Sequence, residues 1–164
     1  MRPRDTTTSL LLLLSLFVWA GMVLGISFLE APLKFTAPHI TVPLGLGIGR
    51  IVFQALNKVE LVLATMTVLC AWRLQVPSHI AATLGLLSAI LLLQTFWLLP
   101  ALDARALALL AGNPAPPNSM HTTYIGLEVL KVITLLLTGT WAYRWVLYQT
   151  ATSTHSLRHE RQLA

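Results

Sequence analysis

The last long apolar run of the chain, residues 121–147, reads "HTTYIGLEVLKVITLLLTGTWAYRWVL". From position 124 onward it is long enough to cross a membrane as a helix, which takes about 20 residues. The run nevertheless contains His121, Glu128 and Lys131. Ionisable side chains are costly in lipid and usually face the interior of a helix bundle. The run therefore predicts a membrane helix with one polar face.

Three further apolar runs are long enough to cross a membrane as helices, at residues 9–29, 51–72 and 79–99. Of the 164 residues, 55% are apolar and only 10% are charged, whereas soluble domains are about 45–50% apolar and about 25% charged. We therefore expect an all-α integral membrane protein. Its four transmembrane helices form one bundle over residues 1–150, and residues 151–164 form a polar, frayed tail. The first run follows two arginines and contains "VWA", as a signal peptide could. Its uncharged stretch exceeds the usual signal core of about 7–15 residues, so we expect a retained helix.

The basic residues predict the orientation of the bundle. One side carries six of them and the other carries three, so the positive-inside rule places both termini in the cytoplasm. The first group is Arg2, Arg4, Arg73, Arg144, Arg158 and Arg161, and the second is Lys34, Arg50 and Arg105. The second side also has two proline-rich stretches, at 30–43 and 112–119, which predict loops. We expect location in a bacterial inner membrane. The scattered basic residues argue against binding to nucleic acid.

Polar residues recur at helical spacing in two of the runs. Steps of three or four residues place side chains on one face of a helix. In the run at 51–72 and just before it, one such face consists of Arg50, Phe53, Asn57, Glu60, Ala64 and Thr67, whereas Lys58 lies off it. In the last run, one face consists of His121, Tyr124, Glu128, Lys131 and Leu135.

These two faces lie at matching depth. With a rise of about 1.5 Å per residue, Glu60 lies about 15 Å below Arg50, and Lys131 the same distance below His121. Both helices enter from the outer side, so we predict a shared polar pocket that opens outward and ends near the midplane. Arg50 and His121 would line its mouth. The predicted binding residues are Arg50, Asn57, Glu60, His121, Tyr124, Glu128 and Lys131, with Glu60, Glu128 and Lys131 at the floor.

Three functions fit this pattern. The pocket could bind or pass a small solute, an ion or a proton, with Lys131 paired to Glu60 or to Glu128. The protein could instead be a membrane oxidoreductase that acts on a quinone-like or aromatic substrate. Third, the charges could form a buried salt-bridge network that only fixes helix packing, as in a structural accessory subunit. Whether the protein is an enzyme stays open at this point.

The sequence predicts neither a metal site nor a cofactor. A haem held by two histidines needs two imidazoles that face each other, and only His39 and His121 share the outer side. His39 lies in a proline-rich stretch, so we do not expect it to be a ligand. Cys70 is the single cysteine and predicts a packed thiol. The expected partners are the lipid bilayer, a small polar ligand and a second copy of the chain in a homo-oligomer.

Four stretches carry a resemblance to a known family: "GISFLEAPLKF" (25–35), "GRIVFQALNKVE" (49–60), "LLPALDARA" (98–106) and "MHTTYIGLEVLKV" (120–132). They resemble the transmembrane protein 205-like family of four-helix membrane proteins. The resemblance implies the four-helix fold and no defined activity. The chain departs from the family in being more charged at "LNKVE" and "LEVLK". A weaker similarity is to the anthrone oxygenase-like four-helix proteins, which implies a membrane enzyme. The positions that match the first family are Gly21, Phe28, Pro32, Pro100, Arg105 and His121.

Overall fold

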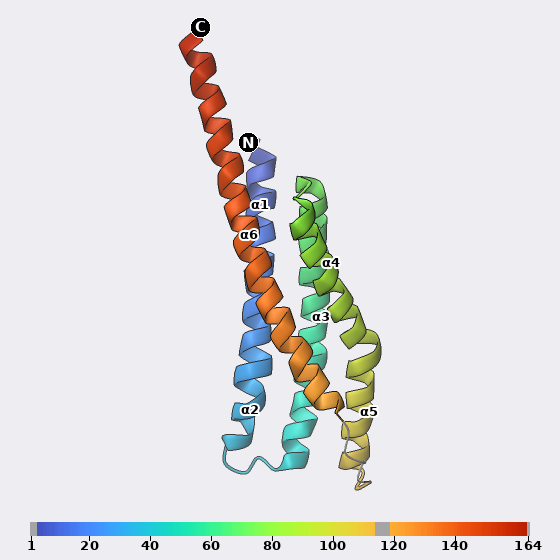
Figure 1. The fold of residues 1–164 in the computed structure, drawn as a ribbon. Helices are drawn as coiled ribbons and strands as arrows, with labels where there is room; N and C mark the ends of the chain where they lie inside the picture. Colours follow the sequence, from blue (N-terminus) through green and yellow to red (C-terminus); the bar gives the residue numbers. More distant parts are fainter. Residues whose placement is uncertain (1–2, 114–118, 164) are drawn as a thin grey trace.

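The chain folds into four long helical segments (Figure 1). The structure is a computed structural model that describes the backbone of residues 3–113 and 119–163 and the side chains of residues 6–113 and 119–151. Each segment is long and apolar enough to cross a membrane, and the described residues contain no strand. The prediction of an all-helical chain with four such helices is therefore confirmed. The four segments are Thr6–Thr36, Val42–Leu74, Ser78–Leu110 and Met120–Ala151.

The first and third segments change helix type along their length. The first consists of α1 (Pro3–Val23), a π-helical stretch η1 (Leu24–Glu30), α2 (Ala31–Leu33) and a 3₁₀ turn η2 (Lys34–Thr36). The third consists of α4 (Ser78–Leu93), a second π-helical stretch η3 (Gln94–Leu98) and α5 (Leu99–Leu110). The second segment is the single helix α3 (Val42–Leu74), and the fourth begins α6 (Met120–Leu163).

Both π-helical stretches end two residues before a proline, at Pro32 and Pro100. Proline has no backbone N–H and its ring crowds the carbonyl one turn earlier, so it disturbs a regular α-helix. The wider π turn absorbs this disturbance, and the helix continues instead of ending. Single π turns of this kind are frequent at functional sites. Here they hold Ser27 and Gln94, whose contacts are described below.

The helices are longer than the sequence predicts, mainly at the end of the bundle opposite the two termini. We call this end the far end, and the other the terminal end. Helix α3 begins at Val42 rather than at residue 51, because the Thr41 side chain caps it and Pro43 lies in its first turn. The predicted loop at 30–43 is reduced to the short linker between Thr36 and Val42. The predicted frayed tail is also wrong for the backbone, because α6 continues to Leu163.

The four segments surround a common interior. Helix α1 packs against α3 and α6, and α4 also packs against α3 and α6, so α3 and α6 lie across a diagonal (Figure 1). The terminal half of this interior is mostly apolar, with a few buried hydroxyls such as those of Ser15, Thr67 and Thr138. Helix α6 approaches α1 closely at Gly139, where an added Cβ would lie 3.0 Å from the Phe17 ring. The filling side chains include Leu12, Leu16, Trp19, Leu63, Leu87 and Leu135.

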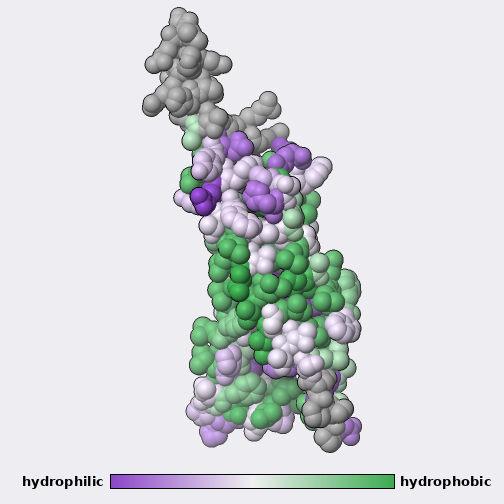
Figure 2. Space-filling view, viewed as in Figure 1, coloured by the Kyte–Doolittle hydropathy of each residue, from purple (hydrophilic) through white to green (hydrophobic). Residues whose placement is uncertain are grey.

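The outer surface is suited to lipid. Figure 2 shows apolar side chains over most of the middle of one face, with hydrophilic ones gathered towards both ends. The four segments have 31 to 33 residues and are therefore about 46–50 Å long at about 1.5 Å per residue. A hydrocarbon core is about 30 Å thick, so segments of this length exceed the span that it requires. The candidate site lies at the far end of the bundle.

Candidate functional site

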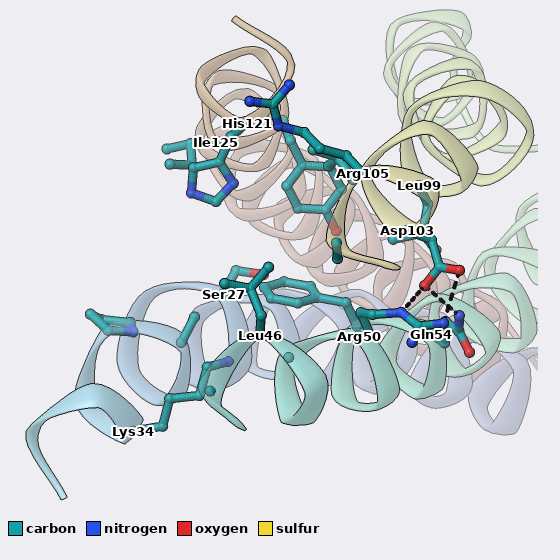
Figure 3. A pocket seen from close by; sticks show the side chains of 18 of the residues that line it. Ser27, Lys34, Leu46, Arg50, Gln54, Leu99, Asp103, Arg105, His121 and Ile125 are labelled. Atoms are coloured by element: carbon teal, nitrogen blue, oxygen red, sulfur yellow. Dashed lines mark hydrogen bonds and ion pairs between the residues drawn. The ribbon is translucent and has the colours of Figure 1, made fainter. Parts of the chain in front are cut away.

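A cavity of about 610 Å³ lies between the four segments at the far end (Figure 3). Its walls come from η1, α2 and η2 of the first segment, the first turns of α3, α5, and the start of α6. Sites for small molecules have this size, a mostly apolar lining and a few placed polar groups. The polar or charged side chains that line the cavity are Ser27, Lys34, Arg50, Gln54, Asp103, Arg105, His121, Tyr124 and Glu128.

Aromatic rings form much of the apolar wall. Phe28, Phe35 and Phe53 line the cavity, and the Phe53 ring meets the Tyr124 ring edge to face at 5.6 Å and 87°. The Phe35 ring lies directly against the backbone of α3 at Gly45, where an added Cβ would run into it. This position in α3 therefore needs glycine for the ring to lie where it does. The aromatic wall suits an apolar or aromatic molecule.

Charged groups surround the cavity towards the far end. Arg50 binds Asp103 with two contacts, Nε to Oδ1 at 2.6 Å and Nη2 to Oδ2 at 3.1 Å. This fork joins α3 to α5, and Gln54 donates to the same carboxylate at 3.1 Å (Figure 3). On the first segment, Lys34 Nζ lies 3.5 Å from Glu30 Oε2. These pairs stabilise the positions of the helix ends that form the mouth.

A buried charge cluster lies beneath the cavity. Lys131 Nζ is 2.6 Å from Glu60 Oε1 and 2.7 Å from Glu128 Oε1. All three side chains are 1% exposed or less. Buried charges are tolerated when they are paired and hydrogen-bonded, so this cluster meets the condition. It joins α3 to α6 across the diagonal of the bundle.

Neutral donors complete the hydrogen bonding of the cluster. Gln94 accepts from Lys131 Nζ at 2.7 Å and donates to Glu128 Oε1 at 2.8 Å. Ser27 donates to Glu128 Oε2 at 2.7 Å, and the Trp19 indole N–H donates to Glu60 Oε1 at 2.8 Å. All four helical segments therefore contribute a side chain to this cluster. It consists of Trp19, Ser27, Glu60, Gln94, Glu128 and Lys131.

The structure separates the predicted binding residues into three places. Arg50, His121, Tyr124 and Glu128 line the cavity. Glu60 and Lys131 do not line it, so the prediction that they form its floor together with Glu128 is wrong. They lie deeper because the cavity ends at Glu128 and Ser27. Asn57 does not line the cavity either. Its side chain is buried, and its Nδ2 donates to Thr95 Oγ1 at 2.9 Å.

Seven polar residues of the cavity and the cluster lie outside the predicted binding set: Trp19, Ser27, Lys34, Gln54, Gln94, Asp103 and Arg105. Trp19 and Ser27 lie on the first segment, at the helical spacing of eight residues. With Ser15, this spacing could have indicated a third polar face. Gln94 is a strongly polar residue within the predicted run at 79–99, but its spacing alone does not place it with the acids. Asp103 lies beyond that predicted run, whereas in the structure the segment continues through it as α5.

The described residues do not suggest a metal site. Within residues 6–113 and 119–151, no three His, Cys, Asp or Glu side chains are grouped so that they could hold a metal ion. His39 lies in the linker before α3 with a positive φ of 67°. Cys70 is buried in the apolar terminal half. His155 and His159 lie outside the described side chains.

Comparison of the chain with protein families, with curated proteins and with solved structures yields no significant match. The resemblance to the transmembrane protein 205-like family therefore stays a prediction, as does the weaker similarity to anthrone oxygenase-like proteins.

Proposed function

We propose that this protein binds a small molecule with an apolar body and a polar or anionic group in the far-end cavity. The observation that carries the proposal is an aromatic-walled cavity that ends on a carboxylate and a hydroxyl, those of Glu128 and Ser27. The apolar body would lie along the phenylalanine rings. An anionic group would lie near the cationic side chains Lys34 and Arg105. A hydrogen-bond donor would instead reach Ser27 and Glu128.

Binding fits the packing of the bundle better than passage. Below the cluster, the terminal half is filled by leucines and by Trp19, several of which have no exposed surface. A solute that entered the cavity would meet this apolar layer. This packing therefore favours a binding cavity over a channel.

A second candidate is a membrane oxidoreductase for a quinone-like or aromatic substrate. The observation that favours it is the number of rings around the cavity, Phe28, Phe35, Phe53 and Tyr124. A flat aromatic molecule packs well against such rings. The third alternative, an accessory subunit, would use the charge cluster for packing alone.

The orientation of the protein is part of the proposal. We place it in a bacterial inner membrane with both termini in the cytoplasm, so that the cavity faces outward. The support is the excess of basic residues at the terminal end. Arg73 and Arg144 of this group are described, whereas the side chains of Arg2, Arg4, Arg158 and Arg161 lie outside the described residues.

Two buried alanines provide a matched test of the cavity. Ala106 lines it and is 6% exposed, whereas Ala142 lies in the terminal core and is 0% exposed. Each is replaced by cysteine in a Cys70→Ala background. A small charged methanethiosulfonate, added outside intact cells, should react with Ala106→Cys and leave Ala142→Cys unlabelled. Labelling of Ala106→Cys only in inverted vesicles would contradict the orientation but not the cavity.

The same labelling reports occupancy. Octanoate, which has an apolar chain and a carboxylate, should slow the labelling of Ala106→Cys in purified protein. Slowing by menadione, a quinone, without slowing by octanoate would favour the oxidoreductase instead. Failure of both compounds to slow the reaction would contradict both functions.

A further inference from the structure

The charge cluster contains one negative charge more than its single cation can balance. Glu60 and Glu128 are two carboxylates, and both contact the one ammonium of Lys131, at 2.6 Å and 2.7 Å. Their other hydrogen-bond partners are neutral: Trp19, Ser27 and Gln94. If every ionisable group were charged, the buried cluster would carry a net charge of −1.

No other described group is placed to balance this charge. On the first segment, Glu30 and Lys34 pair with each other. On α3, Arg50 is paired with Asp103, and Lys58 is exposed on the outside of the helix. On the third segment Gln94 is neutral, and on α6 the Tyr124 phenol lies one turn above Glu128. Arg105 and His121 also line the cavity, but the ion pairs of Glu60 and Glu128 with described residues are those with Lys131. The excess charge therefore belongs to the cluster itself.

A buried, uncompensated charge costs several kcal/mol, and protonation is the usual way in which a protein avoids that cost. One proton on either carboxylate makes the cluster neutral. We propose that the Glu60–Lys131–Glu128 cluster binds one proton and exchanges it with the far-end cavity through the Glu128 carboxyl. The exchange is a simple transfer between cavity water and a carboxylate oxygen, and it needs no other reactant. It does not depend on which ligand the cavity binds.

The hydrogen bonds around Glu128 can form with its carboxyl group either charged or protonated. Ser27 Oγ lies 2.7 Å from Glu128 Oε2 and donates to it when the carboxylate is charged. A hydroxyl can also accept a hydrogen bond. When Oε2 carries the proton, the Ser27 hydroxyl turns and accepts from it. Gln94 and Lys131 contact the other oxygen, Oε1, so they keep their bonds in both states.

The cluster exchanges its proton from the side of the far-end cavity. Glu128 and Ser27 line the cavity, whereas Glu60 does not. Towards the terminal end, Glu60 is covered by Trp19, and the next turns are occupied by Leu63 and Leu135, which belong to the apolar core. A proton that arrives from the cavity can therefore reach the cluster. Beyond it the buried polar groups are hydroxyls, such as those of Ser15, Thr67 and Thr134, which bond to one another or to carbonyls of their own helices. Among the described side chains, no further Asp, Glu, Lys, Arg or His is buried.

Infrared spectroscopy of the full-length protein in lipid nanodiscs tests the proton count. At neutral pH the wild type should show the C=O stretch of one protonated, buried carboxyl per chain. Glu60→Gln and Glu128→Gln should each lose this band, because the remaining carboxylate is then balanced by Lys131. Lys131→Gln should double the band. The matched control Glu30→Gln, which changes a carboxylate outside the cluster, should leave it unchanged.

A second measurement tests the route. Transfer to D₂O shifts the band as the proton exchanges, and a bulky thiol reagent attached at Ala106→Cys should slow that shift by filling the cavity. The variants are compared only after gel filtration and thermal unfolding show that they are folded. Absence of the band in the wild type, or its retention in Glu128→Gln, would overturn the proposal. Exchange that is equally fast with the cavity blocked would overturn the assigned route.

Discussion

The Lys131 ammonium lies 2.6 Å from the Glu60 carboxylate, although 71 positions separate the two residues in the chain. The pair connects α6 with α3 across the diagonal of the bundle, between helices whose backbones do not pack directly on each other. Side chains from the other two segments complete its hydrogen bonding. One ion pair therefore fixes the relative depth of all four segments.

Loss of the shared cation should destabilise the fold strongly. Lys131→Met leaves two buried carboxylates without a counter-ion, and removal of one partner from a buried ion pair costs about 3–5 kcal/mol. We expect a loss at the lower end of that range, about 3 kcal/mol, because protonation of the carboxylates offsets part of it. The measurement is the free energy of unfolding in detergent.

Lys58→Met is the matched control for this change. Lys58 also lies in a helix long and apolar enough to cross a membrane, but its side chain is exposed. Its replacement breaks no contact of the cluster and removes a charge from an apolar surface, so the free energy of unfolding should stay the same or rise. Equal effects of the two substitutions would show that the cluster does not hold α6 against α3.

Removal of the Ser27 hydroxyl should weaken the link between the first segment and α6. A hydrogen bond to a charged group contributes about 1.5–3 kcal/mol, and Ser27 is only partly buried, so we expect Ser27→Ala to cost about 1–2 kcal/mol. Ser88→Ala is the control, because Ser88 donates to the Leu84 carbonyl of its own helix. Thermal unfolding of the two variants should separate them, and a Ser27→Ala protein as stable as Ser88→Ala would contradict the assigned bond.

Two glycines of α3 should respond in opposite directions to replacement by alanine. At Gly45 the new methyl group would run into the Phe35 ring, whereas at Gly47 nothing lies within 4 Å. Overpacking costs about 1–3 kcal/mol, while alanine gains up to about 1 kcal/mol over glycine in a helix. Gly45→Ala should therefore unfold more easily than the wild type, and Gly47→Ala should be equally or more stable. Similar stabilities for both variants would mean that the ring does not lie against α3.

Replacement of the whole cluster distinguishes a binding site from a packing device. A buried ion-pair network can often be replaced by apolar residues with no loss of stability. The triple variant Glu60→Leu, Glu128→Leu and Lys131→Leu should therefore stay folded. If a hydrogen-bond donor of the ligand reaches Glu128 at the cavity floor, the neutral 1-octanol should slow the labelling of Ala106→Cys in the otherwise unchanged chain and not in this background. Unchanged protection would favour a cluster that serves packing alone.

Much of the architecture follows from the sequence. Four long apolar runs in a chain with few charges leave little choice but membrane-spanning helices. The positions of Glu60, Glu128 and Lys131 on helical faces follow from spacing alone, because lipid is a poor solvent for charge. Their similar depth follows from counting residues along helices that start at the same end of the bundle.

The helix ends could not be predicted in the same way. Prolines and glycines at 32, 43, 45 and 100 are ordinarily signs of loops. Here π turns precede two of the prolines, Thr41 caps the helix that contains Pro43, and Phe35 fills the space at Gly45. These compensations come from neighbouring turns and side chains, which local sequence patterns do not reveal.

The sequence by itself determined which side chains had to avoid lipid, because that follows from the cost of charge in a hydrocarbon solvent. Only the tertiary structure decided which of them meet each other. Trp19, Ser27 and Gln94 join the cluster because two π turns and the diagonal arrangement of α3 and α6 bring four distant segments together. The same packing leaves Glu128 at the cavity and encloses Glu60 and Lys131 beneath it. Helical spacing sets the direction in which a residue points, whereas its partners depend on the rotation and tilt of every other helix.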